Sequence, residues 1–192
     1  MSHSLQSYLQ RLIPMSNGTA DQIEGYFKHE VISRNSSIIS PGQTSRKSYF
    51  LKEGIIRSYI IDIKGNEVTT RIYCAPDFLN DFQSFFKKEP SKEYLETITD
   101  CEVQTLDFQS AQECFHGIPE FREWGRMMLT MNYSVLHSNM IDFHTETAEE
   151  RYLKLMTDYP EIIQKVPLKI VASYLGITDS SLSRIRKKLS NQ

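Results

Sequence analysis

The 192-residue sequence contains no apolar stretch near the roughly 18 consecutive residues that a membrane-spanning helix needs. Residues 1–6 show no charged segment followed by an apolar block, so they do not resemble a signal peptide. We therefore expect a cytoplasmic protein with no membrane partner.

Cysteine is scarce and scattered. Cys74, Cys101 and Cys114 stand far apart, with no Cys-x-x-Cys pair among them. An odd, dispersed set argues against a disulfide framework, a zinc site or an iron–sulfur cluster. The five histidines show no evident ligand pairing either; His137 and His144 lie a heptad apart and could approach their mates in a dimer. We expect no metal and no bound cofactor.

Catalytic motifs are also missing. There is no Gly-rich phosphate loop, no Gly-x-Ser-x-Gly and no His-Glu-x-x-His sequence. Glu146, Glu149 and Glu150 lie near His144, but they stand where a helix is predicted to start, and acidic side chains are favoured there. We expect a protein without enzymatic activity.

The charge is distributed unevenly along the chain. Residues 166–192 contain five basic side chains and one acidic one, a net charge of +4. Because the whole chain carries −2, residues 1–165 carry −6. A basic end on an acidic body is typical of a protein that meets nucleic acid with that end.

Between about residue 31 and residue 107 the sequence is rich in short β-type segments separated by turns. Residues 55–63 and 68–73 flank a turn at Gly65 and predict one hairpin. Residues 94–98 and 103–106 predict a second hairpin. Short strands at this spacing predict an antiparallel sandwich or barrel of roughly eight strands.

Residues 119–145 predict one long helix with an unusually wide apolar surface. One apolar stripe consists of Trp124, Met128, Met131 and Val135, and a neighbouring one of Leu129, Leu136, Met140 and Phe143. A surface this wide can cover the β-rich domain and also a second copy of the chain. The alternative is a helix buried within one subunit; we favour a homodimer because so short a chain has little else to cover the helix.

The sharpest motif lies close to the C-terminus. Ala172 supplies the small residue that a helix-turn-helix needs where its helices cross, and Gly176 fits a chain reversal with positive φ. Ile177 can fill the angle between the helices, and Thr178 can cap a second helix over residues 179–189. The pattern predicts a DNA-binding helix-turn-helix, an unrelated helical hairpin being the alternative.

In such a motif the exposed face of the second helix enters the major groove. Arg184 is the best candidate for reading a base, because a guanidinium can bind guanine O6 and N7 together. Arg186 and the lysines would contact phosphates, or would only favour the helix dipole. The predicted DNA-binding residues are Thr178, Asp179, Ser180, Ser181, Ser183, Arg184, Lys187 and Lys188.

A β-rich domain, one long helix and this motif together resemble the Crp/Fnr family of bacterial regulators, over nearly the whole chain. The resemblance is closest to the shorter, Bacteroidetes-type members. It is carried by Pro41-Gly42, the segment 49–54 with its closing glycine, the turn at 62–67, Pro76-Asp77-Phe78 and residues 99–102.

The resemblance implies an α+β fold in three parts. Residues 1–118 would form a cyclic-nucleotide-binding-like sensor domain, an antiparallel β-roll (a double-stranded β-helix or jelly roll). Residues 119–145 would be the dimerisation helix, and residues 146–192 the helix-turn-helix domain. It further implies a homodimer that binds a palindromic operator on double-stranded DNA, an effector in the β-roll, and RNA polymerase as a further candidate partner.

The sequence departs from the cyclic-nucleotide-binding members, which hold the ribose with a glutamate and the cyclic phosphate with an arginine. Alignment places Asn80 and Asp81 at the Gly-Glu pair, and Ser91 and Lys92 at the start of the Arg-Ser cassette. The phosphate-binding arginine is thus absent, and the acidic Glu93 follows directly. Since a buried phosphate needs charge-assisted partners, we do not expect a cyclic nucleotide as the effector.

We predict Asn80, Asp81, Ser91 and Lys92 as the lining of a pocket for an unidentified effector. The pocket could instead be collapsed, and the candidates for filling it are Phe82, Phe85 and Phe86.

Family members usually follow the recognition helix with a two-stranded wing that contacts the DNA backbone. This sequence ends at Gln192, about three residues past the last apolar position of that helix. We therefore expect a helix-turn-helix that lacks a full wing and a weaker or more dimer-dependent affinity for DNA. The alternative function is a dimeric ligand-sensing or protein-interaction module that does not bind DNA.

Overall fold

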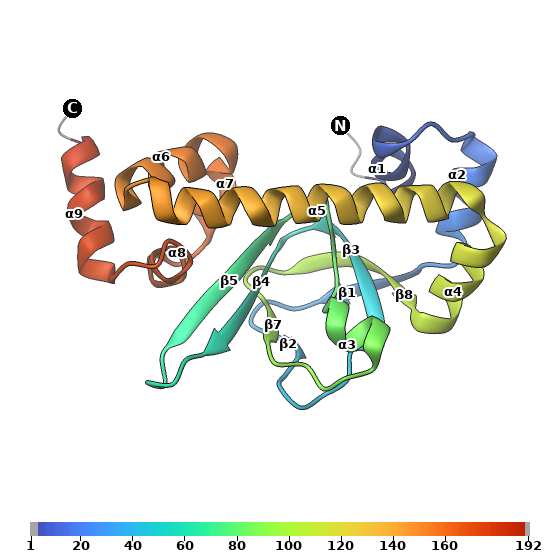
Figure 1. Cartoon of the computed structure of the whole chain (residues 1–192), viewed down its shortest axis with the longest axis horizontal. Coiled ribbons are helices and arrows are strands. Elements are labelled where there is room, and N and C mark those ends of the chain that lie inside the picture. Colours follow the sequence, from blue (N-terminus) through green and yellow to red (C-terminus); the bar gives the residue numbers. More distant parts are fainter. Residues whose placement is uncertain (1–3, 191–192) are drawn as a thin grey trace.

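The computed structural model describes residues 4–190 and places a β-roll beneath one long helix, with helices gathered at both ends (Figure 1). The N-terminal helices are α1 (Leu5–Leu12) and α2 (Asn17–Glu24). The strands are β1 (Lys28–Ile32), β2 (Ser37–Ile39), β3 (Lys47–Glu53), β4 (Ile55–Ile61), β5 (Glu67–Cys74), β6 (Asp77–Leu79), β7 (Tyr94–Thr97) and β8 (Cys101–Asp107). The other helices are α3 (Phe82–Lys87), α4 (Phe108–Gly117), α5 (Pro119–Thr145), α6 (Ala148–Asp158), α7 (Pro160–Lys165), α8 (Leu168–Tyr174) and α9 (Asp179–Ser190).

The strands form two four-stranded antiparallel sheets, in the orders β1-β8-β3-β6 and β2-β7-β4-β5. The α+β fold with a β-roll is confirmed, and so is the hairpin formed by β4 and β5. The predicted hairpin between β7 and β8 is wrong, because these strands lie in different sheets. The turn at Thr99 takes the chain from one sheet to the other. The Thr99 hydroxyl accepts a hydrogen bond from the Ile55 amide at 2.9 Å.

Alternation along the strands separates two apolar layers. Leu51, Leu79 and Val103 pack inside the roll, whereas their neighbours Phe50 and Phe78 pack on the outside of the sheet against α1, α4 and α5. Other buried side chains of the roll interior are Ile39, Ile56, Tyr73, Leu95 and Cys101.

The phenylalanines of α3 lie outside the roll interior. Phe85 is buried in the outer layer together with Phe50, and Phe82 and Phe86 remain 42% and 44% exposed. The expectation that these three rings fill the roll is therefore wrong, because aliphatic side chains and Tyr73 occupy that space.

The long helix expected from the sequence is present as α5. Pro119 stands in its first turn, and Trp124 is buried edge-on against Phe78, with ring centroids 5.0 Å apart. Beyond this point the helix leaves the outer layer, and most of its large apolar side chains are exposed. Among residues 4–190 no helix is both long and apolar enough to cross a membrane.

The C-terminal helices pack against the outside of the second sheet. Thr147 and Glu150 form the predicted capping box at the start of α6. Tyr152 and Leu155 of α6 share one apolar cluster with Ile55 and Ile98 of the roll. The apolar contacts therefore fix the C-terminal unit on the roll in this structure.

Candidate functional site

Two helices, α8 and α9, are joined by a tight turn. Gly176 has a φ of +69°, a conformation that glycine adopts without strain, and the Ile177 amide donates to the Ala172 carbonyl at 3.0 Å. Ala172 and Leu182 are buried between the helices. The Thr178 hydroxyl accepts a hydrogen bond from the Ser181 amide at 3.2 Å, so it caps α9 as the sequence predicts.

The opposite face of α9 is open to solvent. Ser181 is half-buried, and every other predicted DNA-binding residue is exposed. Lys188 is engaged within the chain, since its Nζ lies 2.7 Å from the Glu149 carboxylate. Arg184, Arg186 and Lys187 make no ion pair with any residue between 4 and 190. The positive charge of α9 that has no acidic partner among the described residues therefore resides in these three side chains.

Ser173 of α8 attaches the C-terminal helices α6–α9 to the free edge of β5. Its hydroxyl donates to the Glu67 carbonyl and accepts from the Thr69 amide, both at 2.9 Å. The contact replaces the missing strand partner at that edge.

A second contact joins the unit to the end of α5. The Arg151 guanidinium donates to the Glu146 carbonyl at 2.6 Å and to the Leu175 carbonyl at 3.0 Å. A Cβ on Gly176 would lie 2.8 Å from the Phe143 ring. The turn between α8 and α9 is thus packed directly against the last turn of α5.

Replacing Ser173 by alanine is expected to lower the free energy of unfolding by about 1–3 kcal/mol, because it leaves a buried amide and a carbonyl unpaired. Thr69 is only 4% exposed, so water does not readily replace the hydroxyl. Urea denaturation of the full chain measures the loss. Ser183→Ala removes the same group from the exposed face of α9 and should leave stability unchanged; equal effects of the two substitutions would contradict the docking role.

The four residues predicted to line an effector pocket differ in their hydrogen-bond partners and exposure. Asp81 caps α3 by accepting from the Ser84 amide at 3.0 Å, and Asn80 donates to the Ser48 hydroxyl at 3.2 Å. Ser91 is buried in a turn, where its hydroxyl bonds to the backbone of Glu93. Lys92 is exposed. The hydrogen bonds of Asp81 and Ser91 are local, whereas that of Asn80 reaches Ser48 on β3, so whether the four residues form a pocket stays a prediction.

A polar group that the sequence reasoning did not assemble lies around Glu93. The hydroxyls of Ser58 on β4 and Thr70 on β5 are 2.8 Å apart, and both favour the charged form of the nearby Glu93 carboxyl, which lowers its pKa. Burial raises the pKa of Glu93 above its usual value, and the Asp81 carboxylate raises it further. The period-two alternation within the predicted hairpin was the available signal, but pairing Ser58 with Thr70 required the exact register.

Two arginines of the second sheet, Arg57 and Arg71, are held by carboxylates. Arg57 is nearly buried and lies 2.9 Å from Glu67 and 2.8 Å from Glu96. Arg71 stacks on Tyr73 and lies 3.7 Å from the Asp77 carboxylate. Both guanidiniums already have acidic partners, so neither is a free fork for a phosphate.

The raised pKa of Glu93 predicts that Glu93→Gln increases the stability of the folded protein in a pH-dependent way. The folded protein binds this proton more tightly than the unfolded chain, so the penalty on folding grows as the pH rises from the unfolded-state pKa to the folded-state pKa and is complete above it. The glutamine variant should melt at a higher temperature than the wild type at pH above neutrality. The difference should vanish below the unfolded pKa of about 4.3, where both forms are neutral. Melting curves across this range measure it, and Glu89→Gln, at an exposed position, is the control. A gain that is independent of pH would contradict the assignment.

Comparison with known proteins agrees with this architecture. Residues 29–116 match the family model of the cyclic nucleotide-binding domain. Among curated proteins, none matches the sequence. Many solved structures share the fold.

Three of these structures cover most of the chain. The c-di-GMP responsive global regulator CLP of Xanthomonas campestris has a TM-score of 0.73 at 16% identity, with 92% of each chain covered. FixK2 of Bradyrhizobium japonicum has a TM-score of 0.71 at 18% identity, covering 86% of this chain and 85% of its own. A putative Crp/Fnr-family transcriptional regulator of Eubacterium rectale has a TM-score of 0.71 at 12% identity, covering 94% of this chain and 88% of its own.

The fold of the present chain, a β-roll followed by a long helix and a terminal helical unit, is therefore similar to these three structures over most of its length. Residues 29–116 are similar to the cyclic nucleotide-binding domain, and the chain shares its fold with a Crp/Fnr-family regulator, as the sequence resemblance implied. The narrower resemblance to Bacteroidetes-type members stays a prediction.

Proposed function

We propose that the protein is a cytoplasmic, homodimeric transcription regulator of Crp/Fnr type that reads a palindromic operator through α9. The observation that carries this proposal is the free Arg184 on the exposed face of a helix whose inner face is buried behind the glycine turn. A helix-turn-helix places this face in the major groove, with flanking cations on phosphates. The protein has no catalytic role in this proposal.

The exposed side of α5 supports the homodimer. Leu129, Tyr133, Leu136, Met140 and Phe143 are spaced alternately by four and three residues and are 48–71% exposed. This spacing is the seam of a coiled coil, in which each side chain inserts between residues of a facing helix. Two parallel copies of α5 around a twofold axis would hold both α9 helices on the same side, as a palindrome requires.

The division of labour follows the three segments proposed from the sequence. Residues 1–118 sense a small molecule, 119–145 dimerise and 146–192 bind DNA. Arg151 and Ser173 connect the DNA-binding segment to α5 and to the roll, so a change in the sensor domain on binding a small molecule can reach α9 through these contacts.

The effector in this proposal is not a cyclic nucleotide. The Glu93 group carries a carboxylate where a phosphate would need a cation, and the nearby guanidiniums are paired. Cyclic AMP or cyclic GMP at about 1 mM should therefore leave the melting temperature unchanged, because a ligand that binds only the folded state would raise it. A concentration-dependent rise would contradict this expectation, with adenosine as the uncharged control.

Selection of bound fragments from sheared genomic DNA of the source organism tests the function directly. Enrichment of a palindrome with half-sites about one helical turn apart would support a dimeric regulator. Salt-sensitive binding without enrichment would indicate that an effector is required. Failure to bind any DNA, at low salt and with the dimer intact, would favour the protein-interaction module.

A further inference from the structure

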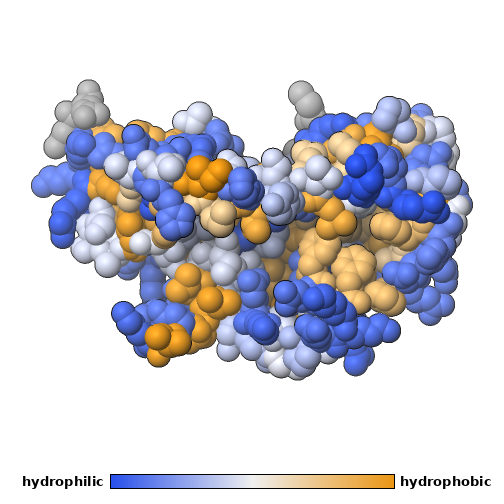
Figure 2. All heavy atoms as spheres, viewed as in Figure 1, coloured by the Kyte–Doolittle hydropathy of each residue, from blue (hydrophilic) through white to orange (hydrophobic). Residues whose placement is uncertain are grey.

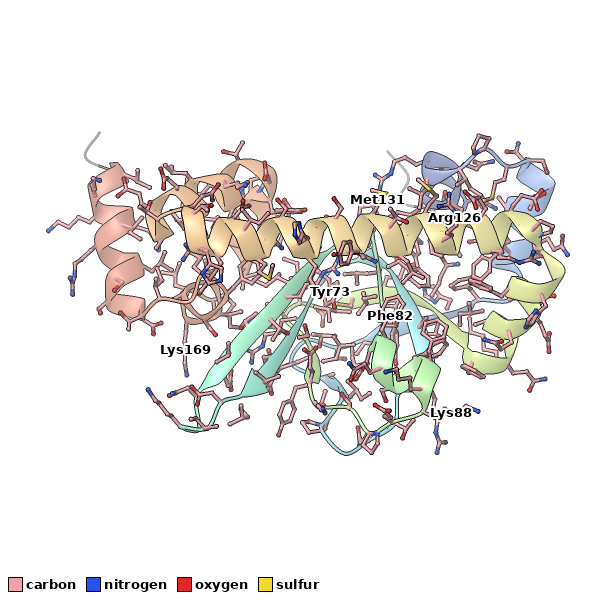
Figure 3. All side chains as sticks on the ribbon, in the orientation of Figure 1. Tyr73, Phe82, Lys88, Arg126, Met131 and Lys169 are labelled. Atoms are coloured by element: carbon pink, nitrogen blue, oxygen red, sulfur yellow. The ribbon has the colours of Figure 1, made fainter. Side chains whose placement is uncertain are left out.

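An apolar cavity lies on the outside of the roll, between α3, α4 and α5. Its volume is about 410 Å³. Figure 2 shows the corresponding hydrophobic area as an orange hollow below the right half of α5, bordered by hydrophilic residues. Figure 3 labels Phe82 at the start of α3, the helix that forms the lower wall in this view, and Lys88 directly after its last residue. The volume is within the range of small-molecule sites, roughly 300–1,000 Å³.

This cavity is separate from the roll interior. Phe78 and Leu106 line it, and both belong to the outer layer of the sheet. Leu79 and Val103, which belong to the same two strands, pack inside the roll instead. A molecule in this cavity would therefore lie on the opposite side of the sheet from the interior core.

Most of the cavity wall is apolar, and part of it is open to solvent. Phe82 and Phe86 of α3 stack with ring centroids 5.4 Å apart and remain 42% and 44% exposed. Phe121 and Leu129 of α5 also contribute to the wall, and Leu129 is 48% exposed. An occupant that covers these side chains removes apolar surface from water, so the cavity favours an apolar body.

A polar row lies beside these rings on α3. Gln83 and Lys87 also line the cavity and are exposed, and their spacing of four residues places them on one face of the helix, next to the pair Phe82 and Phe86. Among the described lining residues Lys87 is the only charged one, and it makes no ion pair with any residue between 4 and 190. An anionic group at this rim therefore meets a cation and an amide donor, with no carboxylate in the wall to repel it.

We propose that this cavity binds an amphiphile with an apolar body and one anionic head group, of the size of a medium-chain carboxylate. The body covers the rings of Phe82 and Phe86. The head accepts hydrogen bonds from the Lys87 ammonium and the Gln83 amide, both of which remain accessible to solvent. The two rows lie side by side on α3, so one short molecule reaches both. This inference concerns binding alone and does not depend on DNA binding.

Binding of decanoate, decanol and decylammonium to the full chain tests the proposal, because the three probes share one alkyl chain and differ in the charge of the head group. Trp124 lines the cavity and is the only tryptophan, so its fluorescence reports occupancy, and the melting temperature provides a second readout. Decanoate should change the fluorescence and raise the melting temperature. Decylammonium should bind roughly fivefold more weakly than decanoate, because Lys87 attracts one head group and repels the other.

Substitutions at Lys87 make the test of the head group specific. Lys87→Gln should weaken decanoate binding roughly twofold to fivefold, the contribution of one exposed ion pair, and should leave decanol binding unchanged. Lys87→Glu should make decylammonium bind more tightly than decanoate. Lys88→Gln is the matched control, because Lys88 is exposed and adjacent but lies over the Phe108 ring, 4.7 Å from its centroid, and does not line the cavity. It should leave decanoate binding unchanged.

Substitutions at the rings test the apolar body. Phe82→Ala with Phe86→Ala removes partly exposed side chains and should weaken decanoate and decanol alike, by roughly tenfold. Tyr159→Ala, at a similarly exposed ring of the C-terminal helices, should weaken neither. Circular dichroism of each variant confirms that it is folded.

Any of five outcomes would overturn the proposal. They are absence of any decanoate effect, decylammonium binding as tight as that of decanoate, equal effects of Lys87→Gln and Lys88→Gln, unchanged binding in the Phe82/Phe86 variant, and binding confined to a monomeric variant. The last would mean that a second copy of the chain covers the cavity. None of these outcomes bears on whether α9 binds DNA.

Discussion

Leu136→Glu together with Met140→Glu is expected to convert the protein into a folded monomer that no longer retains operator DNA. Both side chains are more than half exposed on α5, so the isolated subunit loses little from the change. In a symmetric dimer the pair removes four apolar side chains from the seam. At about 1.5–3 kcal/mol each, the loss is at least 6 kcal/mol, or roughly 10⁴-fold in the dimer dissociation constant.

Sedimentation of the purified variant measures the change in association state, and circular dichroism confirms that it is folded. Leu153→Glu with Met156→Glu is the matched control, because it places the same charges at exposed apolar positions of α6. The control should remain dimeric and bind DNA. If the variant with the α5 substitutions remained dimeric, the exposed apolar face of α5 would not be the dimer interface.

Arg184→Ala is expected to abolish discrimination between the operator and unrelated DNA while preserving the dimer. A bidentate arginine–guanine contact contributes about 1–3 kcal/mol, and a palindrome contains it twice. The expected loss for the operator is therefore about 2–6 kcal/mol, which corresponds to roughly 30-fold to 10⁴-fold. Unrelated DNA, held through phosphates alone, should lose far less.

Titrations across a range of salt concentrations separate this role from general electrostatics. Lys187→Ala should weaken operator and unrelated DNA alike and should reduce the salt dependence by about one phosphate contact per subunit. Lys64→Ala, which removes the same charge from the exposed β4–β5 turn, is the control and should change neither. If Arg184→Ala weakened binding of operator and unrelated DNA equally, Arg184 would not be the residue that reads the base.

Local signals were the most informative part of the sequence. Gly176, Thr178 and the capping residues Thr147 and Glu150 act through contacts within a few positions of themselves, so their roles could be predicted without the fold. The apolar periodicity of α5 identified the long helix for the same reason.

Long-range pairing was harder to predict. The strands β7 and β8 are adjacent in sequence and were expected to pair, but the roll assigns them to opposite sheets. The docking of Ser173 on β5 joins residues more than a hundred positions apart, and no periodicity indicates it. The apolar cavity between α3, α4 and α5 was missed because its wall comes from several separate segments, and because the rings of α3 were considered only as a possible filling of the roll.

The contact of Ser173 with β5 also bears on solubility. β5 is the last strand of its sheet, and an uncovered edge is a template on which another chain can add a strand. By occupying the Glu67 carbonyl and the Thr69 amide, α8 closes this template at one end of the strand. Any rearrangement that lifts α8 from the roll would reopen it, so the resting arrangement of the C-terminal helices also protects the protein from aggregation.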